Sequence, residues 1–246
     1  MENARVVLVH GFTGINESWA GVTAELGPGF EVVPVGLPGH GTSDPGNLGF
    51  EQAAAAIGEA GGRAAYVGYS MGGRLCLRLA VDRPDLVSAL VLIGASPGLA
   101  SASDRAARRE ADERLAASIE RDGTEKFLQR WLSHPLFATL DPSPEELDRR
   151  RQNAPEGLAS ALRLLGAGAQ EPLWDRLGEL RMPVLVMVGE RDQKFLATSH
   201  EMVEAGLKAR LEVVPTVGHA VHLEDSASCG RLIREFLSGP PDRPSS

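Results

Sequence analysis

The chain has 246 residues, of which 43% are hydrophobic and 24% are charged. These are ordinary values for a globular protein, and α/β chains of this length often fold as one domain. A formal net charge of -8 leaves no basic stripe, so nucleic-acid binding is not expected. The acidic balance also means that an anionic substrate would need a local cluster of cationic side chains.

The first residues and the cysteines favour a cytoplasmic protein. Met1-Glu2-Asn3 leads straight into a short apolar run, so no secretory signal peptide is expected. No apolar run approaches the roughly 18 residues that a membrane-spanning helix needs. Cys76 and Cys229 lack metal-ligand spacing and are predicted to be buried thiols in a reducing compartment. Neither a metal nor an organic cofactor is indicated.

Short apolar runs that alternate with helical patterns occupy most of the chain. The predicted strands are Arg5–His10, Phe30–Val35, Ala64–Tyr69, Leu86–Ile93, Val184–Gly189 and Leu211–Val214. The predicted helices between and after them are Trp19–Leu26, Phe50–Ala60, Met71–Arg83, Ser199–Gly206 and Ala227–Leu237. Nearly continuous apolar strands that alternate with helices predict a mostly parallel central sheet with helices on both faces.

One long stretch, between Ser96 and Asp175, interrupts this alternation and contains no convincing strand. Helices are predicted there at Asp104–Arg121, Glu125–Leu132, Pro144–Asn153 and Gly157–Gly166. A helical insertion this late in the sheet is expected to cover the carboxyl ends of the strands. We therefore expect a core made of residues 1–95 and 176–238, a helical cap at 96–175, and a disordered Pro- and Ser-rich tail at 239–246.

A G-x-S-x-G motif, Gly68–Gly72, lies directly after a predicted strand and directly before a predicted helix. In that context the serine sits on a strained turn, and the glycines give the backbone room to turn sharply. The turn exposes the Ser70 hydroxyl above the sheet, where the helix N-terminus favours a developing anion. This arrangement is the nucleophile elbow of the α/β-hydrolase fold, which is the fold that the sequence predicts.

The elbow serine needs an imidazole to take its proton and a carboxylate to orient that imidazole. In this fold the partners follow in the order Ser, Asp, His. Asp192 and His219 each come just after a predicted strand, at the same sheet edge as Ser70. Glu190 and His222 are the competing residues. We expect Glu190 to be a surface residue and His222 to pack or hydrogen-bond nearby.

The loop after the first strand, His10-Gly11-Phe12, is expected to supply one oxyanion-hole donor. In this fold the second donor is the residue after the serine. Here the donors are the backbone N–H groups of Phe12 and Met71, so the identity of their side chains matters little. The imidazoles of His10 and His40 are expected to be structural.

The order of several longer blocks makes the resemblance more specific. HGFTG, LPGHG, GYSMGGR, ASPGL, RWLSHPLF, GERDQKF and GHAVHLE occur in the order found in the MenH family. The chain resembles this family from about Val6 to Leu237. Its members are 2-succinyl-6-hydroxy-2,4-cyclohexadiene-1-carboxylate (SHCHC) synthases of menaquinone biosynthesis. The resemblance implies a lyase that eliminates pyruvate from SEPHCHC, the succinyl-enolpyruvyl-cyclohexene precursor, with Ser70, Asp192 and His219 acting as the general base.

The same resemblance implies a set of substrate-binding residues. Arg74 matches an arginine that holds a substrate carboxylate, and Arg108 matches a second arginine that projects from the cap. Trp131 matches an aromatic residue that lines the site, and Tyr69 and Lys194 match residues at or beside the pocket. Arginine binds carboxylates through a planar fork, which suits a small polycarboxylate substrate.

Plainer roles for these residues stay open at this point. Arg108 lies in a charged run and could belong to a solvated helix face, Trp131 could be cap core, and Lys194 could be a surface lysine. The alternative function is a serine hydrolase of a small carboxylated ester, lactone or C–C bond substrate. A non-catalytic binding module is a third possibility, because a fold alone does not establish activity.

Overall fold

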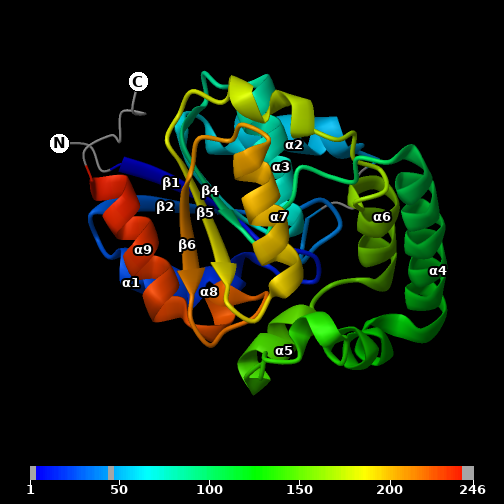
Figure 1. The fold of residues 1–246 in the computed structure, drawn as a ribbon. Coiled ribbons are helices and arrows are strands. Elements are labelled where there is room, and N and C mark those ends of the chain that lie inside the picture. The colour runs from blue at the N-terminus through cyan, green and yellow to red at the C-terminus, as the bar shows by residue number, and fades with distance from the viewer. Residues whose placement is uncertain (1–3, 44–46, 240–246) are drawn as a thin grey trace.

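A parallel six-stranded sheet forms the centre of the computed structural model, which describes residues 4–43 and 47–239 (Figure 1). The strands are β1 (Ala4–Val9), β2 (Phe30–Val35), β3 (Ala64–Tyr69), β4 (Val87–Ile93), β5 (Val184–Gly189) and β6 (Arg210–Val214). Their order is β2-β1-β3-β4-β5-β6, and every neighbouring pair of described strands runs parallel. The predicted α/β-hydrolase fold is confirmed.

Helices cover both faces of the sheet because the side chains of each strand alternate between them. On one face, Val6 and Leu8 pack with α1 (Ala20–Leu26) and α9 (Ser226–Ser238). On the other face, Val7 and Val9 belong to a cluster that includes α2 (Phe50–Gly61), α3 (Met71–Asp82) and residues in and after α7 (Gln193–Glu204). Each fully buried valine or leucine stabilises the fold by about 1.5–3 kcal/mol relative to an exposed one.

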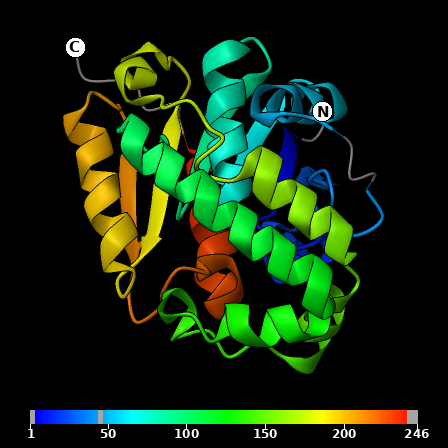
Figure 2. The same ribbon diagram turned by 90° about the vertical axis from the view of Figure 1, so that its right-hand side faces the viewer.

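The regular elements between β4 and β5 are all helices. This segment contains α4 (Ala102–Leu132), a 3₁₀ turn (Pro135–Phe137), α5 (Pro144–Arg151), α6 (Pro155–Leu165) and a second 3₁₀ helix (Trp174–Glu179). Figure 2 shows α4 and α6 side by side, and a separate apolar cluster that includes Ile119, Phe127 and Leu158 joins them. We propose on this ground that the segment is a cap with a core of its own.

Two of the predicted helices share one label, α4, but a non-helical residue separates them. Asp104–Arg121 and Glu125–Leu132 both belong to α4, which is kinked at Gly123. Gly123 has φ 78° and ψ 165°, a conformation that is essentially restricted to glycine. The glycine therefore separates the two helices where the sequence suggested a break.

The start of α7 was also predicted wrongly. The helix begins at Gln193 rather than at Ser199, because the Asp192 side chain accepts a hydrogen bond from the Phe195 N–H and caps it. A short helix, α8 (Val221–Glu224), has no predicted counterpart.

No helix among the residues at 4–43 and 47–239 is long and apolar enough to cross a membrane. The start of the chain, on which the signal-peptide expectation rests, lies at residues 1–3 outside the described ones, and so does the predicted disordered tail beyond Gly239.

Candidate active site

Ser70 lies on the sharp turn between β3 and α3. Its backbone has φ 49° and ψ -109°, in the positive-φ range that costs a non-glycine residue about 1–3 kcal/mol. A Cβ on Gly68 would come within 2.6 Å of the Gly72 carbonyl oxygen, and a Cβ on Gly72 would collide with the Val9 carbonyl oxygen. Only glycine therefore fits two positions before and two positions after the serine. The Ser70 N–H is anchored by a 2.8 Å bond to the Ile93 carbonyl.

The structure brings the three predicted catalytic side chains together. His219 Nε2 lies 3.1 Å from Ser70 Oγ, and His219 Nδ1 lies 2.6 Å from Asp192 Oδ2. An ionised carboxylate only accepts hydrogen bonds, so we assign the imidazole proton to Nδ1. His219 Nε2 is then free to accept the proton of the Ser70 hydroxyl, as a general base must. His219 and Asp192 are both buried, with 2% and 6% of their surfaces exposed.

The two competing residues occupy other places. Glu190 is exposed, and its carboxylate accepts a hydrogen bond from the Thr216 N–H at 2.9 Å. His222 is buried between the rings of Trp19 and Tyr69. Burial lowers the pKa of His222 well below its usual value, with the Arg150 charge as the second cause. Glu190 is thus a surface residue and His222 a packed one, as expected.

Glu224, which no predicted site included, holds the loop that carries His219. Its carboxylate accepts hydrogen bonds from the N–H of Gly218 at 2.8 Å and from the N–H of Ala220 at 3.0 Å. These two residues flank His219. The acidic residue in GHAVHLE, five positions after the histidine, was the available signal. The Phe195 ring packs against His219 from α7, with a centroid distance of 4.6 Å.

The predicted oxyanion-hole residues flank the serine from two elements. Met71 is the first residue of α3, and Phe12 lies in the turn after β1. Neither backbone N–H donates a hydrogen bond to another of the described residues. The first N–H groups of a helix lack partners within it, so the Met71 N–H is available to an anion.

His10 and His40 are neutral structural residues that fix the loop after β1. His40 Nδ1 donates to the Pro38 carbonyl and its Nε2 accepts from the Thr13 N–H. His10 Nε2 likewise accepts from the Leu37 N–H, and its Nδ1 donates to the Gly11 carbonyl. Burial lowers the pKa of His10 to about 4 and that of His40 to about 3.

Arg74 is a buried cation without a carboxylate partner among the described residues. Its guanidinium donates to the Gln170 side chain at 2.9 Å and to the Leu165 carbonyl at 2.7 Å, and it lies 5.3 Å from the Phe50 ring centroid. Burial, with the Arg108 charge as the second cause, lowers the pKa of Arg74 to about 9, so the side chain stays charged at pH 7. A buried charge without a counter-ion is costly.

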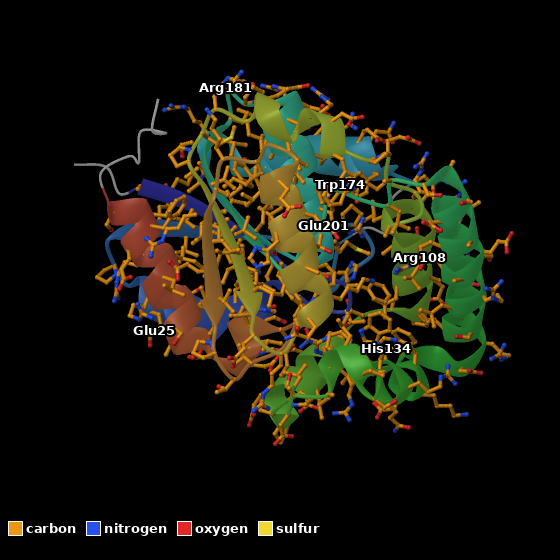
Figure 3. All side chains as sticks on the ribbon, viewed as in Figure 1. Glu25, Arg108, His134, Trp174, Arg181 and Glu201 are labelled. Carbon is orange, nitrogen blue, oxygen red and sulfur yellow. The ribbon has the colours of Figure 1, made fainter. Side chains whose placement is uncertain are left out.

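Arg108 lies in the region where α4 and α6 run side by side (Figure 3). Its Nε donates to the buried carboxylate of Asp112 at 2.8 Å, one turn further along α4. Its side chain is 42% exposed, so this is neither a fully solvated face nor a core position. The two arginines are near enough for Arg108 to affect the pKa of Arg74.

Trp131 belongs to an aromatic cluster over the oxyanion-hole loop. Its ring lies 5.4 Å from Phe12, 5.7 Å from Phe127 and 5.6 Å from Phe137, and Phe137 in turn contacts His219 at 6.1 Å. The indole Nε1 is buried and has no hydrogen-bond partner among the described residues. A buried donor of this kind is normally satisfied, and a bound molecule can satisfy it.

Tyr69 contacts His219 directly, whereas Lys194 lies near it only through Phe195. The buried Tyr69 ring lies 5.2 Å from the imidazole, measured between ring centroids. Burial raises the pKa of the Tyr69 hydroxyl. Lys194 is exposed, and its ammonium lies 5.7 Å from the ring of Phe195, which packs on His219. Within the part of the chain that is described, no group of three or more His, Cys, Asp or Glu residues could hold a metal ion.

Comparison with known proteins identifies the family. A family model described as the alpha/beta hydrolase family matches residues 6–229. The SHCHC synthase of Citrobacter koseri is 33% identical, covering 94% of this chain and 93% of that protein. A Bacillus subtilis protein that is provisionally assigned the same activity is 36% identical, covering 95% of this chain and 90% of its own length. The solved structure of MenH from S. aureus superposes with a TM-score of 0.88 at 28% identity, covering 96% of this chain and 94% of that one. The chain belongs to the SHCHC synthase (MenH) family within the alpha/beta hydrolases.

Proposed function

We propose that this chain is a carbon–oxygen lyase that eliminates pyruvate from SEPHCHC to give SHCHC in menaquinone biosynthesis. The observation that carries the proposal is the combination of the Ser70–His219–Asp192 arrangement with the buried, unpaired Arg74 cation. The first supplies a general base. The second suits a carboxylate substrate better than a neutral ester.

In the proposed reaction, His219 takes the hydroxyl proton of Ser70 as Ser70 Oγ removes a proton from the ring of the substrate. The electron pair of that C–H bond forms a ring double bond. The existing ring double bond shifts by one position and the C–O bond to the enolpyruvyl group breaks. The imidazolium of His219 then gives its proton to the leaving enolate, which becomes pyruvate. No acyl-enzyme forms. Asp192 stabilises the imidazolium that forms on His219.

The developing negative charge would be stabilised by the N–H groups of Phe12 and Met71. Such a donor contributes about 3–4 kcal/mol in serine proteases. Arg74 and Arg108 would bind the carboxylates of a polycarboxylate substrate, and the unpartnered Nε1 of Trp131 would donate to it. Tyr69 and Lys194 would shape the pocket beside His219. We also propose a cytoplasmic location, which the two buried free thiols of Cys76 and Cys229 support.

Two substrates distinguish the lyase from a serine hydrolase with the same three residues. The lyase releases pyruvate from enzymatically generated SEPHCHC, measured by coupling to lactate dehydrogenase, and turns over neutral chromogenic esters poorly. Efficient ester turnover without pyruvate release from folded protein would instead support a hydrolase.

A further inference from the structure

The backbone next to the proposed oxyanion-hole donor Phe12 is strained. Thr13 has φ 68°, although it is β-branched, and it is fully buried. Positive φ is a genuine outlier for a β-branched residue. Such a conformation persists only where the surrounding structure holds it in place. The partners of Thr13 therefore hold the backbone that directly follows Phe12.

Each polar group of Thr13 has a hydrogen-bond partner. Its N–H donates to His40 Nε2 at 3.2 Å, its carbonyl accepts from Asn153 Nδ2 at 2.9 Å, and its hydroxyl accepts from Arg150 Nη1. Arg150 is in α5 and Asn153 follows that helix. Two of the three partners thus come from the segment between β4 and β5, and not from the core that carries the loop.

Arg150 is itself fixed in a buried ion pair. Its Nε donates to Glu146 Oε1 at 2.9 Å, and the two side chains are only 4% and 5% exposed. Ser18 Oγ, from the region after the strained loop, donates to the same carboxylate oxygen at 3.2 Å. Such a pair holds its guanidinium in one direction because either charge alone would be costly to bury.

Asn153 connects the same helix to a second core loop. Its Oδ1 accepts from the Gly41 N–H at 2.9 Å, while its Nδ2 binds the carbonyls of Thr13 and Arg150. Its side-chain oxygen and nitrogen are therefore both engaged, and the residue is 2% exposed. The loop after β1 and the loop that carries Gly41 are thereby tied to the end of α5.

We propose that Arg150 and Asn153 are positioning residues for the elimination reaction. They hold Thr13 in its strained conformation and so aim the Phe12 N–H at the charge that develops in the transition state. The inference rests on the proposed function, because it takes the Phe12 N–H as an oxyanion-hole donor. It adds that α5 must be docked on the core for full catalysis, and that this docking is not needed for substrate binding.

Removing the Arg150–Thr13 contact from either side tests the inference. In Arg150→Met and in Thr13→Val we expect kcat to fall about 10- to 100-fold, because displaced donors lose much of the stabilisation of an oxyanion. We expect KM to change less than about threefold, since the donors act in the transition state. Thr13→Ser keeps the hydroxyl and should restore kcat to near the wild-type value. The double variant should be no slower than the slower single variant.

The control is Arg163→Met. Arg163 also joins two elements by ion pairs, to Glu113 and Glu120, but it stays within the segment between β4 and β5. Its loss should leave kcat unchanged. If Arg150→Met fails to fold because Glu146 is left unpaired, Arg150→Met/Glu146→Leu removes both charges and should show the same loss of kcat.

Three results separate the possibilities. Folded Arg150→Met with wild-type kcat overturns the inference, and so does a loss that appears mainly in KM. The inference is also overturned if kcat of Thr13→Ser is no higher than kcat of Thr13→Val, because the hydroxyl then has no role. A folded wild type that releases no pyruvate overturns the proposed function instead.

Discussion

His219 Nδ1 and Asp192 Oδ2 lie 2.6 Å apart, although the two residues follow different strands, β6 and β5. The bond fixes the tautomer that leaves Nε2 facing Ser70 Oγ. Asp192 has a second task, because its other oxygen caps α7 through the Phe195 N–H. The same carboxylate therefore orients the base and places the ring that packs on it.

Asp192→Asn should reduce kcat strongly without unfolding the chain. An amide can donate to Nδ1 and stabilise the wrong tautomer, and the same change in serine proteases costs about 10⁴ in kcat. We expect a fall of about 10³- to 10⁴-fold in pyruvate release, with KM nearly unchanged. Glu190→Gln, two residues away and outside the triad, is the control. Equal effects of the two substitutions would contradict the assignment of Asp192.

Glu224→Gln should destabilise the loop around His219. The amide keeps one acceptor oxygen but presents an NH₂ group to the second backbone N–H, of Gly218 or Ala220. Hydrogen bonds to charged groups are worth about 1.5–3 kcal/mol, so the free energy of unfolding should fall by about that amount. Urea denaturation followed by circular dichroism measures the change. Glu201→Gln, at an exposed position on α7, is the control and should have little effect on the unfolding midpoint. An unchanged midpoint in Glu224→Gln would show that Glu224 does not stabilise the loop around His219.

Arg74→Ala should weaken substrate binding more than the chemical step. The loss of a charge-assisted contact of about 1.5–3 kcal/mol corresponds to roughly a 10- to 100-fold rise in KM. Arg74→Lys keeps the charge but loses the planar fork, so it should be intermediate. Arg78→Ala is the control, because Arg78 is one turn further along α3 and pairs with Asp82. A wild-type KM in folded Arg74→Ala would exclude the residue from the substrate site.

Folded-state stability should fall with pH below about 6.5 because of His10 and His40. Their folded pKa values, about 4 and about 3, lie below the usual 6.5. The unfolded chain therefore takes up protons that the folded chain does not as the pH falls from 6.5 toward 4. As the pH falls through that window, each histidine lowers the free energy of unfolding by up to about 1.4 kcal/mol per pH unit. Well above pH 6.5 neither histidine is protonated in either state, so no stability is lost there.

Urea denaturation at pH 7, 6 and 5 measures this slope. His40→Gln, which retains a donor and an acceptor but does not titrate, should reduce it. NMR of the histidine ring protons provides an independent check, since neither imidazole should titrate in the folded state above pH 5. A slope that is the same in His40→Gln and in the wild type would show that His40 is not the cause.

The parts of the fold and site that depend on local pattern could be predicted from the sequence. Buried parallel strands are nearly continuous apolar runs, so their positions were found to within one residue. The strand–turn–helix context of Gly68–Gly72 predicted that Ser70 lies on a sharp turn, and the chain order predicted Asp192 and His219 as its partners. The structure places the three side chains within hydrogen-bond distance of one another. The position of Ser70 follows from the backbone geometry of one turn. The positions of Asp192 and His219 follow from where two strands end.

The parts that depend on contacts between distant segments could not be predicted. Arg150 reads as one member of an exposed run, Arg149–Arg151, yet it is buried against Thr13, 137 residues earlier. Its partner Glu146 reads as an ordinary residue of a charged helix. The predicted break between Arg121 and Glu125 is present at Gly123, but the angle between the two helices that meet there depends on their packing.

Pyruvate release from enzymatically generated SEPHCHC, followed by lactate dehydrogenase coupling in the wild type and in Ser70→Ala, tests the central claim most directly. We predict steady release by the wild type and a loss of at least about 10³-fold in Ser70→Ala, because the proton of the ring then has no acceptor. Release by folded Ser70→Ala at the wild-type rate would contradict the role of Ser70, and no release by the folded wild type would contradict the lyase itself.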